Sequence, residues 1–292
     1  MLNQQNLLIV GAGRVGKTLG RLLVKQGLVD VSAVCNTTIS SAQQACQFIG
    51  AGRAVDRLAD CPSCDLILLT PPDDALKSVI ADLFKHGVVT PNTALLHCSG
   101  CYTANDLVSS NPVSHRIASI HPVMSFAVAE IAVDSFEQVP CAYEGSVAAL
   151  EQWLPLFKAI GADCFPIQSH NKTAYHAGLV CASNYAVSLL DAAQAMLQQA
   201  GLPVDLASRL SDQLMQQSIA NAKRLSCTRT ALTGPIKRGD IETIVQHQRV
   251  LDDDLVSFYQ ALGRYTLTMT NHNQTLQQQL VDVLSESILS SG

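Results

Sequence analysis

The pattern of glycines near the N-terminus constrains the fold of this chain more than any other feature. Gly11, Gly13 and Gly16 have the spacing G-x-G-x-x-G between an apolar run at residues 6–10 and a helical pattern at residues 14–26. In such a loop the first glycine allows a tight turn, the second admits a pyrophosphate, and the third lets helix and strand pack closely. The alternative is a tight turn that binds nothing. We predict a dinucleotide site with contacts from Gly11, Gly13, Arg14, Val15 and Gly16.

Apolar runs continue to alternate with helical patterns through the first half of the chain. The predicted strands lie at residues 31–35, 65–70, 93–98, 116–121, 139–145 and 163–167. After Gln168 only helical patterns follow, the first at 170–200 and a later one at 241–270 with a break near 252–254. Such alternation predicts an α/β fold with a doubly wound parallel sheet. We expect a Rossmann-type dinucleotide domain over residues 1–168 and an all-α domain for substrate and dimerisation over residues 169–292.

The composition limits the partners that this chain can have. A charged fraction of 15% and a net charge of −5 disfavour a nucleic-acid binder, which needs a basic face. The apolar stretch 177–197 contains Asn184, Asp191 and Gln194, so we expect a buried helix and no membrane span. Ten scattered cysteines and the lack of a visible signal peptide indicate reduced thiols in the cytoplasm. Two C-x-x-C pairs lie too far apart for a four-cysteine zinc site, so no metal is expected.

The residues after the second and third predicted strands bear on the choice of cofactor. An NAD site usually has an acidic residue about 20 residues past the glycine loop. Here Asn36 and Thr37 occupy that place, and with Arg14 nearby they favour a 2′-phosphate, so NADP is predicted over NAD. Thr70 and Pro71 follow the third strand and are predicted to lie along the cofactor. A helix begun by proline is the local alternative for this loop.

Polar side chains follow two further strands, where a substrate and the nicotinamide would meet. His97 and Ser99 end one strand, and His121 and Ser125 follow the next. A histidine at a strand end is structural about as often as it is functional. Two of them on consecutive strand ends favour a site. We predict cofactor contacts from His97 and Ser99, a catalytic His121 and a substrate contact from Ser125.

The first long helical pattern carries a further set of candidates. At 100° per residue, Lys172, His176 and Ser183 share one helix face, whereas Asn184 lies off it. A lysine and a histidine on an otherwise apolar helix are candidates for a proton donor and a substrate anchor. A solvated first turn is the alternative, and it explains Lys172 better than it explains His176 or Asn184.

Several segments together resemble an uncharacterised family of Rossmann-like oxidoreductases with a helical C-terminal domain of unknown function. They are GAGRVG, HCSG, His121-Pro122, KTAYHAG, ASNY, ALTGPIKRGD followed by ET, and His247. The family is similar to ketopantoate reductases, pyrroline-5-carboxylate reductases and 6-phosphogluconate-type dehydrogenases, so the resemblance implies NADP-linked hydride transfer and a homodimer. The last group has an asparagine one turn after its lysine, where this chain has His176. The His-Pro pair is also similar to one in prephenate dehydrogenases.

The segment LTGPIKRGD at residues 232–240 combines local structure with a candidate site. Gly234-Pro235 is expected to stop a helix, and Asp240 is placed to cap the next one, with Thr243 in its first turn. Thr233 and Arg238 are left without a local role, and the resemblance implies that they face the substrate.

These observations lead to a functional prediction with one alternative. We predict an NADP-dependent reductase or dehydrogenase that moves a hydride between nicotinamide and a C=O or C=N carbon. His121, Lys172 and His176 would transfer protons, and Ser125, Asn184, Thr233 and Arg238 would bind the substrate. Residues 213–239 hold five basic residues and no acidic one, which favours a small anionic metabolite. The alternative is an NADP-binding sensor or interaction protein without turnover.

Overall fold

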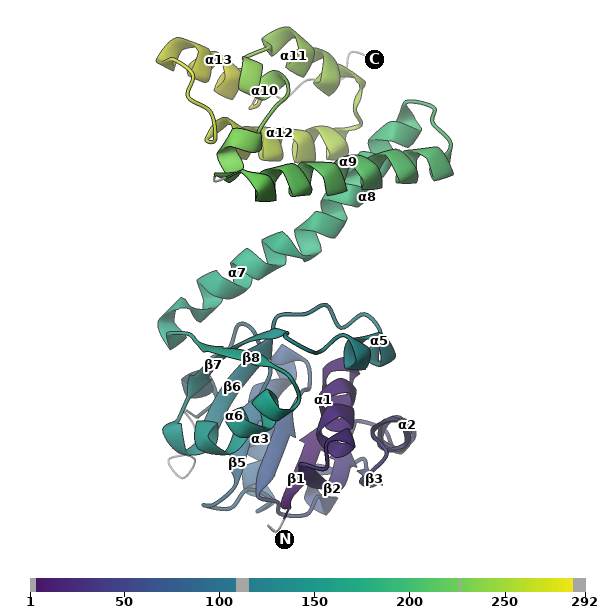
Figure 1. The fold of residues 1–292 in the computed structure, drawn as a ribbon, viewed down its shortest axis with the longest axis vertical. Coiled ribbons are helices and arrows are strands. Elements are labelled where there is room, and N and C mark those ends of the chain that lie inside the picture. Colours follow the sequence, from purple (N-terminus) through teal and green to yellow (C-terminus); the bar gives the residue numbers. More distant parts are fainter. Residues whose placement is uncertain (1–3, 109–115, 226, 286–292) are drawn as a thin grey trace. The chain divides into compact units, whose positions relative to one another are not determined.

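The computed structural model describes residues 4–108, 116–225 and 227–285, and Figure 1 shows its ribbon. The chain divides into two compact units, residues 1–183 and 184–292. The first unit extends past residue 168, where we expected the sheet domain to end. It includes helix α7 (Lys172–Ala182), because Lys172 at the start of this helix is buried against the strands.

The first unit is built on one eight-stranded sheet in the order β3-β2-β1-β4-β5-β6-β7-β8. The strands are β1 (Gln5–Val10), β2 (Val29–Cys35), β3 (Arg53–Val55), β4 (Leu66–Leu69), β5 (Ala94–His97), β6 (Ile117–Pro122), β7 (Pro140–Gly145) and β8 (Asp163–Pro166). Neighbours pair in parallel except β6 and β7, which are antiparallel. The order of the first six strands is that of doubly wound dinucleotide-binding folds. The predicted fold class is confirmed, with one antiparallel pair in a mostly parallel sheet.

Helices cover both faces of this sheet (Figure 1). They are α1 (Arg14–Lys25), α2 (Ile39–Ile49), α3 (Asp73–Lys85), α4 (Ala104–Val108), α5 (Ala129–Asp134) and α6 (Val147–Ala159). Because side chains alternate along a strand, β1 contributes to two cores. Leu7 and Ile9 pack with residues of α1 and α6, whereas Leu8 and Val10 pack with residues of α3. The side chain of Trp153 lies in the first core and donates a hydrogen bond to the Ala94 carbonyl at 3.2 Å.

The second unit is entirely helical in its described part. Its helices are α8 (Asn184–Gln199), α9 (Val204–Arg224), α10 (Pro235–Arg238), α11 (Ile241–Val250), α12 (Asp253–Leu267) and α13 (Gln274–Val283), with a short 3₁₀ turn at Thr228–Ala231. The predicted single helix over 170–200 is divided in the structure, since α7 ends at Ala182 and α8 begins at Asn184, with Ser183 at φ −116° and ψ −75° between them. The break near 252–254 is confirmed. None of the helices that the structure describes is both long and apolar enough to cross a membrane.

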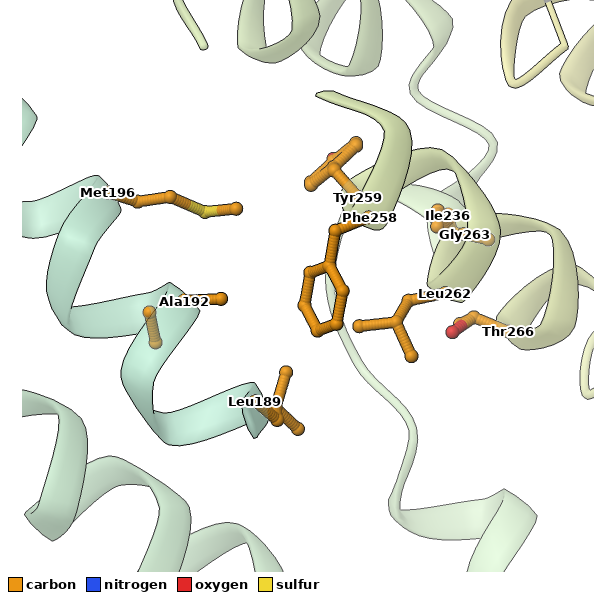
Figure 2. A pocket seen from close by; sticks show the side chains of 10 residues that line it. Leu189, Ala192, Met196, Ile236, Phe258, Tyr259, Leu262, Gly263 and Thr266 are labelled. Carbon is orange, nitrogen blue, oxygen red and sulfur yellow. The ribbon is translucent and has the colours of Figure 1, made fainter. Parts of the chain in front are cut away.

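A cavity of about 210 Å³ lies within the helical unit. Figure 2 shows Leu189 and Met196 of α8 on one side of it and Phe258 and Leu262 of α12 on the other. Tyr259 is the one titratable side chain among the residues that line it. The cavity is therefore lined mostly by apolar side chains.

Candidate functional site

The glycine loop connects β1 to α1 as the sequence pattern requires. Gly11 has φ +79°, and a Cβ there would lie 2.4 Å from the Pro71 nitrogen. A Cβ on Gly16 would lie 2.4 Å from the Thr70 hydroxyl oxygen. That hydroxyl donates a hydrogen bond to the Gly11 carbonyl at 2.9 Å. The loop after β4 therefore packs directly on the glycine loop, which leaves no room for side chains at these two positions.

The N-terminus of α1 is open to an anion. Gly13 precedes the helix, no side chain caps it, and no acidic residue lies in the first turn. The first N–H groups of a helix have no partners within the helix and attract phosphates. Gly13 is exposed, and a Cβ there would meet nothing closer than the Gly11 carbonyl oxygen at 3.9 Å. The Val15 side chain packs on the sheet core, so this residue offers the anion only its backbone.

A residue just after β2 forms a hydrogen bond with the same loop. The side-chain oxygen of Asn36 accepts a hydrogen bond from the Ala12 N–H at 2.7 Å. Thr37 is exposed beside it. Arg14 is exposed and donates a hydrogen bond to the Ala127 carbonyl at 3.3 Å. The direct contacts of Asn36, Thr37 and Arg14 with a 2′-phosphate remain a prediction.

A row of polar side chains crosses three neighbouring strands. His97 on β5 pairs in register with Ser119 on β6, which pairs with Glu144 on β7. Residues opposite one another in a sheet project from the same face. All three are buried, at 0%, 0% and 6% exposure. The strands thus place a carboxylate and a hydroxyl next to each other inside the protein.

Lys172 pairs with this row from the first turn of α7. Its ammonium donates to the Ser119 hydroxyl and to the Glu144 carboxylate, the latter at 3.1 Å. Lys172 is 1% exposed, so the alternative of a solvated first turn is wrong for this residue. Burial lowers the pKa of Lys172, and the Glu144 carboxylate opposes that shift. A buried charge persists when it is paired and hydrogen-bonded, as it is here.

His121 lies on the same face of β6, two residues beyond Ser119, where α7 covers it. Its Nδ1 lies 3.0 Å from the hydroxyl oxygen of Tyr175, at hydrogen-bond distance. The rings of Tyr175 and His176 each meet the His121 ring edge-on, with 5.8 Å between centroids. Residues 172, 175 and 176 share a helix face because they are three and four positions apart. The face that carries Lys172 therefore also holds two rings against His121.

The protonation states of His121 and Tyr175 follow from the burial of these two side chains. Burial, followed by His176 and Lys172, lowers the pKa of His121 to about 4. Burial raises the pKa of Tyr175 to about 12. At neutral pH His121 is therefore a neutral imidazole beside a protonated phenol. Such an imidazole has one nitrogen that accepts a proton and one that donates a hydrogen bond.

The backbone of Gly100 closes one side of the cluster. A Cβ on Gly100 would lie 2.4 Å from His176 Cδ2 and 2.9 Å from His121 Nε2. The preceding Ser99 holds this loop in place. Its hydroxyl donates to the Asp73 carboxylate at 2.8 Å and accepts the N–H groups of residues 101 and 102 at 3.2 and 3.0 Å. Glycine is thus required where the loop contacts both imidazoles.

His97 and Ser99 differ from the expectation that both would stand at an open cleft. His97 is fully buried, and neither ring nitrogen has a hydrogen-bond partner among the described residues. Burial, with Lys172 nearby, holds the pKa of His97 well below its usual range. Ser99 is buried and its hydroxyl is occupied by the loop. The two side chains therefore lie beneath the surface, and their predicted contact with a cofactor stays a prediction.

The predicted substrate residues lie outside this cluster. Ser125 is exposed on the loop after β6. Asn184, Thr233 and Arg238 belong to the second unit and are exposed. Arg238 lies 3.7 Å from the Asp240 carboxylate. Their role in binding substrate is still a prediction.

The segment at 232–240 has the cap that the sequence predicted. Asp240 accepts the Thr243 N–H at 3.2 Å and the Thr243 hydroxyl at 2.8 Å. Gly234 and Gly239 have positive φ, at +94° and +75°. The expectation that Gly234-Pro235 stops a helix is wrong, because Pro235 is the first residue of α10. Proline is favoured at that position, where its missing N–H costs no hydrogen bond.

Three side chains that contact Lys172 or His121 were missing from the predicted site, namely Ser119, Glu144 and Tyr175. Ser119 and Glu144 are isolated polar residues within strands that are otherwise mostly apolar, and that contrast is the signal that could have identified them. Tyr175 lies on the same helix face as Lys172 and His176. Strand register, which brings Ser119 and Glu144 together, cannot be read from one sequence.

The cysteines contribute no metal centre to the described part of the chain. All ten are free thiols. No group of three or more His, Cys, Asp or Glu residues among those described could hold a metal ion. Cys61 and Cys64 of the first C-x-x-C pair are buried in the second core of the sheet.

Both halves of the chain match models of known protein domains. Residues 3–122 match a Rossmann-like domain, and residues 139–266 match a domain of unknown function, DUF2520. The chain therefore combines these two domains, as the sequence resemblance implied. The second match begins at the start of β7, before the helical region. No curated protein sequence matches the chain.

Solved structures with low sequence identity share the fold. A Bacteroides fragilis protein proposed to be an NADP oxidoreductase is 22% identical, with TM-score 0.75, over 91% of this chain and 98% of its own. A Thermotoga maritima protein is 24% identical, with TM-score 0.64, over 95% and 98%. The NADP-bound pyrroline carboxylate reductase of Plasmodium falciparum is 14% identical, with TM-score 0.58, over 98% and 100%. The similarity shows that this chain shares the fold of these proteins.

Proposed function

We propose that this protein is an NADP-dependent oxidoreductase that acts on a C=O or C=N carbon, or on the corresponding alcohol or amine. One observation carries the proposal. The open glycine loop follows β1, and the His121 cluster lies near the end of β6, so both occupy the carboxyl edge of one parallel sheet. That edge is where ligands bind in doubly wound folds.

The residues of the glycine loop fit a nicotinamide dinucleotide. The α1 N-terminus would hold the pyrophosphate, with Gly13 allowing close approach. The Asn36 oxygen is occupied by the Ala12 N–H, so its side-chain N–H groups remain to donate to a ligand. Donors without a carboxylate at this position support NADP over NAD. The bound nicotinamide would give or take the hydride.

The protein's own side chains would donate or accept the proton that accompanies hydride transfer. His121 is neutral at neutral pH and buried beside Tyr175, so it can accept a proton or donate a hydrogen bond to a substrate oxygen or nitrogen. His176, held on the same face, supports the orientation of that ring. Lys172 is engaged with Ser119 and Glu144, so its contribution is a fixed positive charge near His121.

The substrate class rests on the charge of the helical unit and on the related structures. Residues 213–239 are basic without an acidic residue, which supports a small anionic metabolite. The solved structures of similar fold include a proposed NADP oxidoreductase and a pyrroline carboxylate reductase. These neighbours support reduction of a carbonyl or an imine in this chain.

Replacing His121 tests the proposed function. Purified protein would be screened with NADPH, NADH and a panel of small anionic carbonyl and imine compounds, and with the oxidised cofactors and the matching alcohols and amines. His121→Asn is expected to lower turnover by about 100-fold or more while the Kd for NADPH stays within about twofold. The matched control is His170→Asn, because His170 is exposed just before α7.

The possible outcomes separate the proposal from its alternatives. Turnover that is unchanged in His121→Asn would remove His121 from the mechanism. NADPH binding without turnover on any compound would favour a sensor. Tighter binding of NADH than of NADPH would reverse the proposed cofactor preference.

We also propose that the helical unit associates with a second copy of the chain. Helices α8 and α9 keep large apolar side chains exposed, including Val187 at 69%, Leu214 at 65% and Ile219 at 52%. No residue of α8 is buried. Light scattering should give a dimer mass, and Val187→Glu should shift it toward the monomer. A monomeric wild type would overturn this proposal.

A further inference from the structure

Glu144 is a buried carboxylate that enters the function proposed above only as a partner of Lys172. It lies on β7, outside the glycine loop and the His121 ring cluster. One oxygen accepts the Ala104 N–H at 2.9 Å and the Lys172 ammonium at 3.1 Å. The other accepts the Ser169 hydroxyl at 2.9 Å. A carboxylate with three donors in a buried site is held in one orientation.

These contacts attach the start of α7 to the sheet. Ser169 lies in the 3₁₀ turn just before α7, and Lys172 is the first residue of the helix. Both are bonded to the same carboxylate, so the position and direction of the first helical turn are set by β7. Tyr175 and His176 lie one turn further along the same face. Fixing Lys172 therefore fixes the two rings that contact His121.

The ion pair also sets the charge near His121. A buried ammonium loses its proton readily unless an anion compensates it. The groups that act on Lys172 are Glu144 on β7, Cys98 after β5 and Asp73 at the start of α3, and Glu144 has the largest effect among them. The charged ammonium in turn helps to keep His121 and His97 neutral. Tyr175 and His176 are the other titratable groups that contact His121.

We propose that Glu144 is a positioning residue of the site, which acts on His121 through Lys172. The carboxylate holds the ammonium in place and charged, and the ammonium holds the α7 face against His121. The catalytic meaning of this arrangement rests on the function proposed above. The arrangement itself can be tested without any substrate.

The test is a double-mutant cycle read by the titration of His121. Imidazole proton resonances would be followed by NMR in the wild type, Glu144→Gln, Lys172→Met and the double variant, with His121→Asn used to assign the signal. Without Glu144, Lys172 is expected to be neutral near pH 7, so the pKa of His121 rises by roughly half a unit or more. Lys172→Met should raise it similarly. The double variant should match Lys172→Met, because Glu144 acts only through Lys172.

A matched control separates the ion pair from hydrogen bonding to the same carboxylate. Ser169→Ala removes one neutral donor from Glu144 and leaves the ion pair. It should leave the pKa of His121 unchanged. The double variant contains no unpaired charge, so it keeps the test valid if a single variant folds poorly. Circular dichroism in the near ultraviolet would confirm the fold of each variant.

The outcomes distinguish this inference from the proposed function. An unchanged or lower pKa of His121 in folded Glu144→Gln would overturn the positioning role, whatever the turnover. Additive effects in the double variant would also overturn it, because they would mean that Glu144 acts independently of Lys172. The expected titrations in a protein without turnover would support the positioning role and remove the proposed oxidoreductase. With turnover, Glu144→Gln should change kcat and its pH profile more than KM.

Discussion

Breaking the Lys172–Glu144 pair from either side should destabilise the fold with opposite dependence on pH. The ammonium is 1% exposed, the carboxylate 4%, and their atoms are 3.1 Å apart. Lys172→Met leaves the carboxylate unpaired, and Glu144→Gln leaves the ammonium unpaired. Removing one partner of a buried pair typically costs about 3–5 kcal/mol, whereas removing both costs far less.

The ordinary pKa values set an upper limit on the stability that each single variant loses. An unpaired buried group can neutralise itself, and one pKa unit corresponds to about 1.4 kcal/mol. At pH 7, protonating a carboxyl of ordinary pKa about 4.3 costs about 3.7 kcal/mol, and deprotonating an ammonium of ordinary pKa about 10.4 costs about 4.6 kcal/mol. The loss in Lys172→Met should fall below its bound, because Ala104 and Ser169 still donate to Glu144.

The pH dependence follows from the charge that each variant leaves unpaired. In Lys172→Met the buried carboxylate has lost its counter-ion, so the loss of stability is small below about pH 4.3, where a carboxyl is ordinarily protonated, and grows as pH rises. In Glu144→Gln the pKa of Lys172, already lowered by burial, falls further below its unfolded value, so the loss of stability is large at low pH and shrinks toward about pH 10.4. In the double variant, the loss of stability should change with pH in neither of these two ways, because no buried charge is left unpaired.

Urea denaturation at about pH 5, 7 and 9 would measure these deficits as free energies of unfolding. The wild type at each pH is the reference, and the double variant is the control for the lost packing. Two single variants within about 1 kcal/mol of the wild type at pH 7 would mean that the pair is solvated, as surface pairs are. Parallel pH slopes in the two variants would also refute the buried ion pair.

Three other substitutions test the glycine loop and the cofactor. Gly13→Asp adds a side chain into open space and should leave the fold intact, but its charge should weaken NADPH binding by about 10-fold or more in titration calorimetry. Gly178→Ala, whose added Cβ meets no atom within 4 Å, is the control and should bind NADPH normally. Gly11→Ala should lower the free energy of unfolding by about 1–3 kcal/mol, because φ is +79° and the new Cβ overlaps the neighbouring loop. Asn36→Asp keeps the acceptor for the glycine loop and adds a charge, so the ratio of the Kd for NADPH to that for NADH should rise about 10-fold; an unchanged ratio would place the 2′-phosphate elsewhere.

Much of the sheet could be predicted because its signals are local. Strand runs, the glycine spacing and the residues that follow each strand all depend on neighbours in the sequence. The helix face shared by Lys172 and His176 was predicted in the same way, from 100° per residue. The break at Ser183 was not predicted, because residues 170–200 keep a helical pattern throughout.

The sequence by itself determined a glycine loop between the first strand and helix, an alternating α/β half and an all-helical remainder, because each depends on periodicity or on glycine stereochemistry. Only the tertiary structure decided which polar side chains meet. Strand order and register placed Ser119 beside Glu144, because β7 pairs antiparallel with β6 and these two residues lie opposite one another. Burial then made Lys172, which the sequence predicted as a proton donor with a solvated first turn as the alternative, one half of an ion pair. Register and burial depend on contacts between residues far apart in the chain, such as Glu144 and Lys172, and no local pattern encodes them.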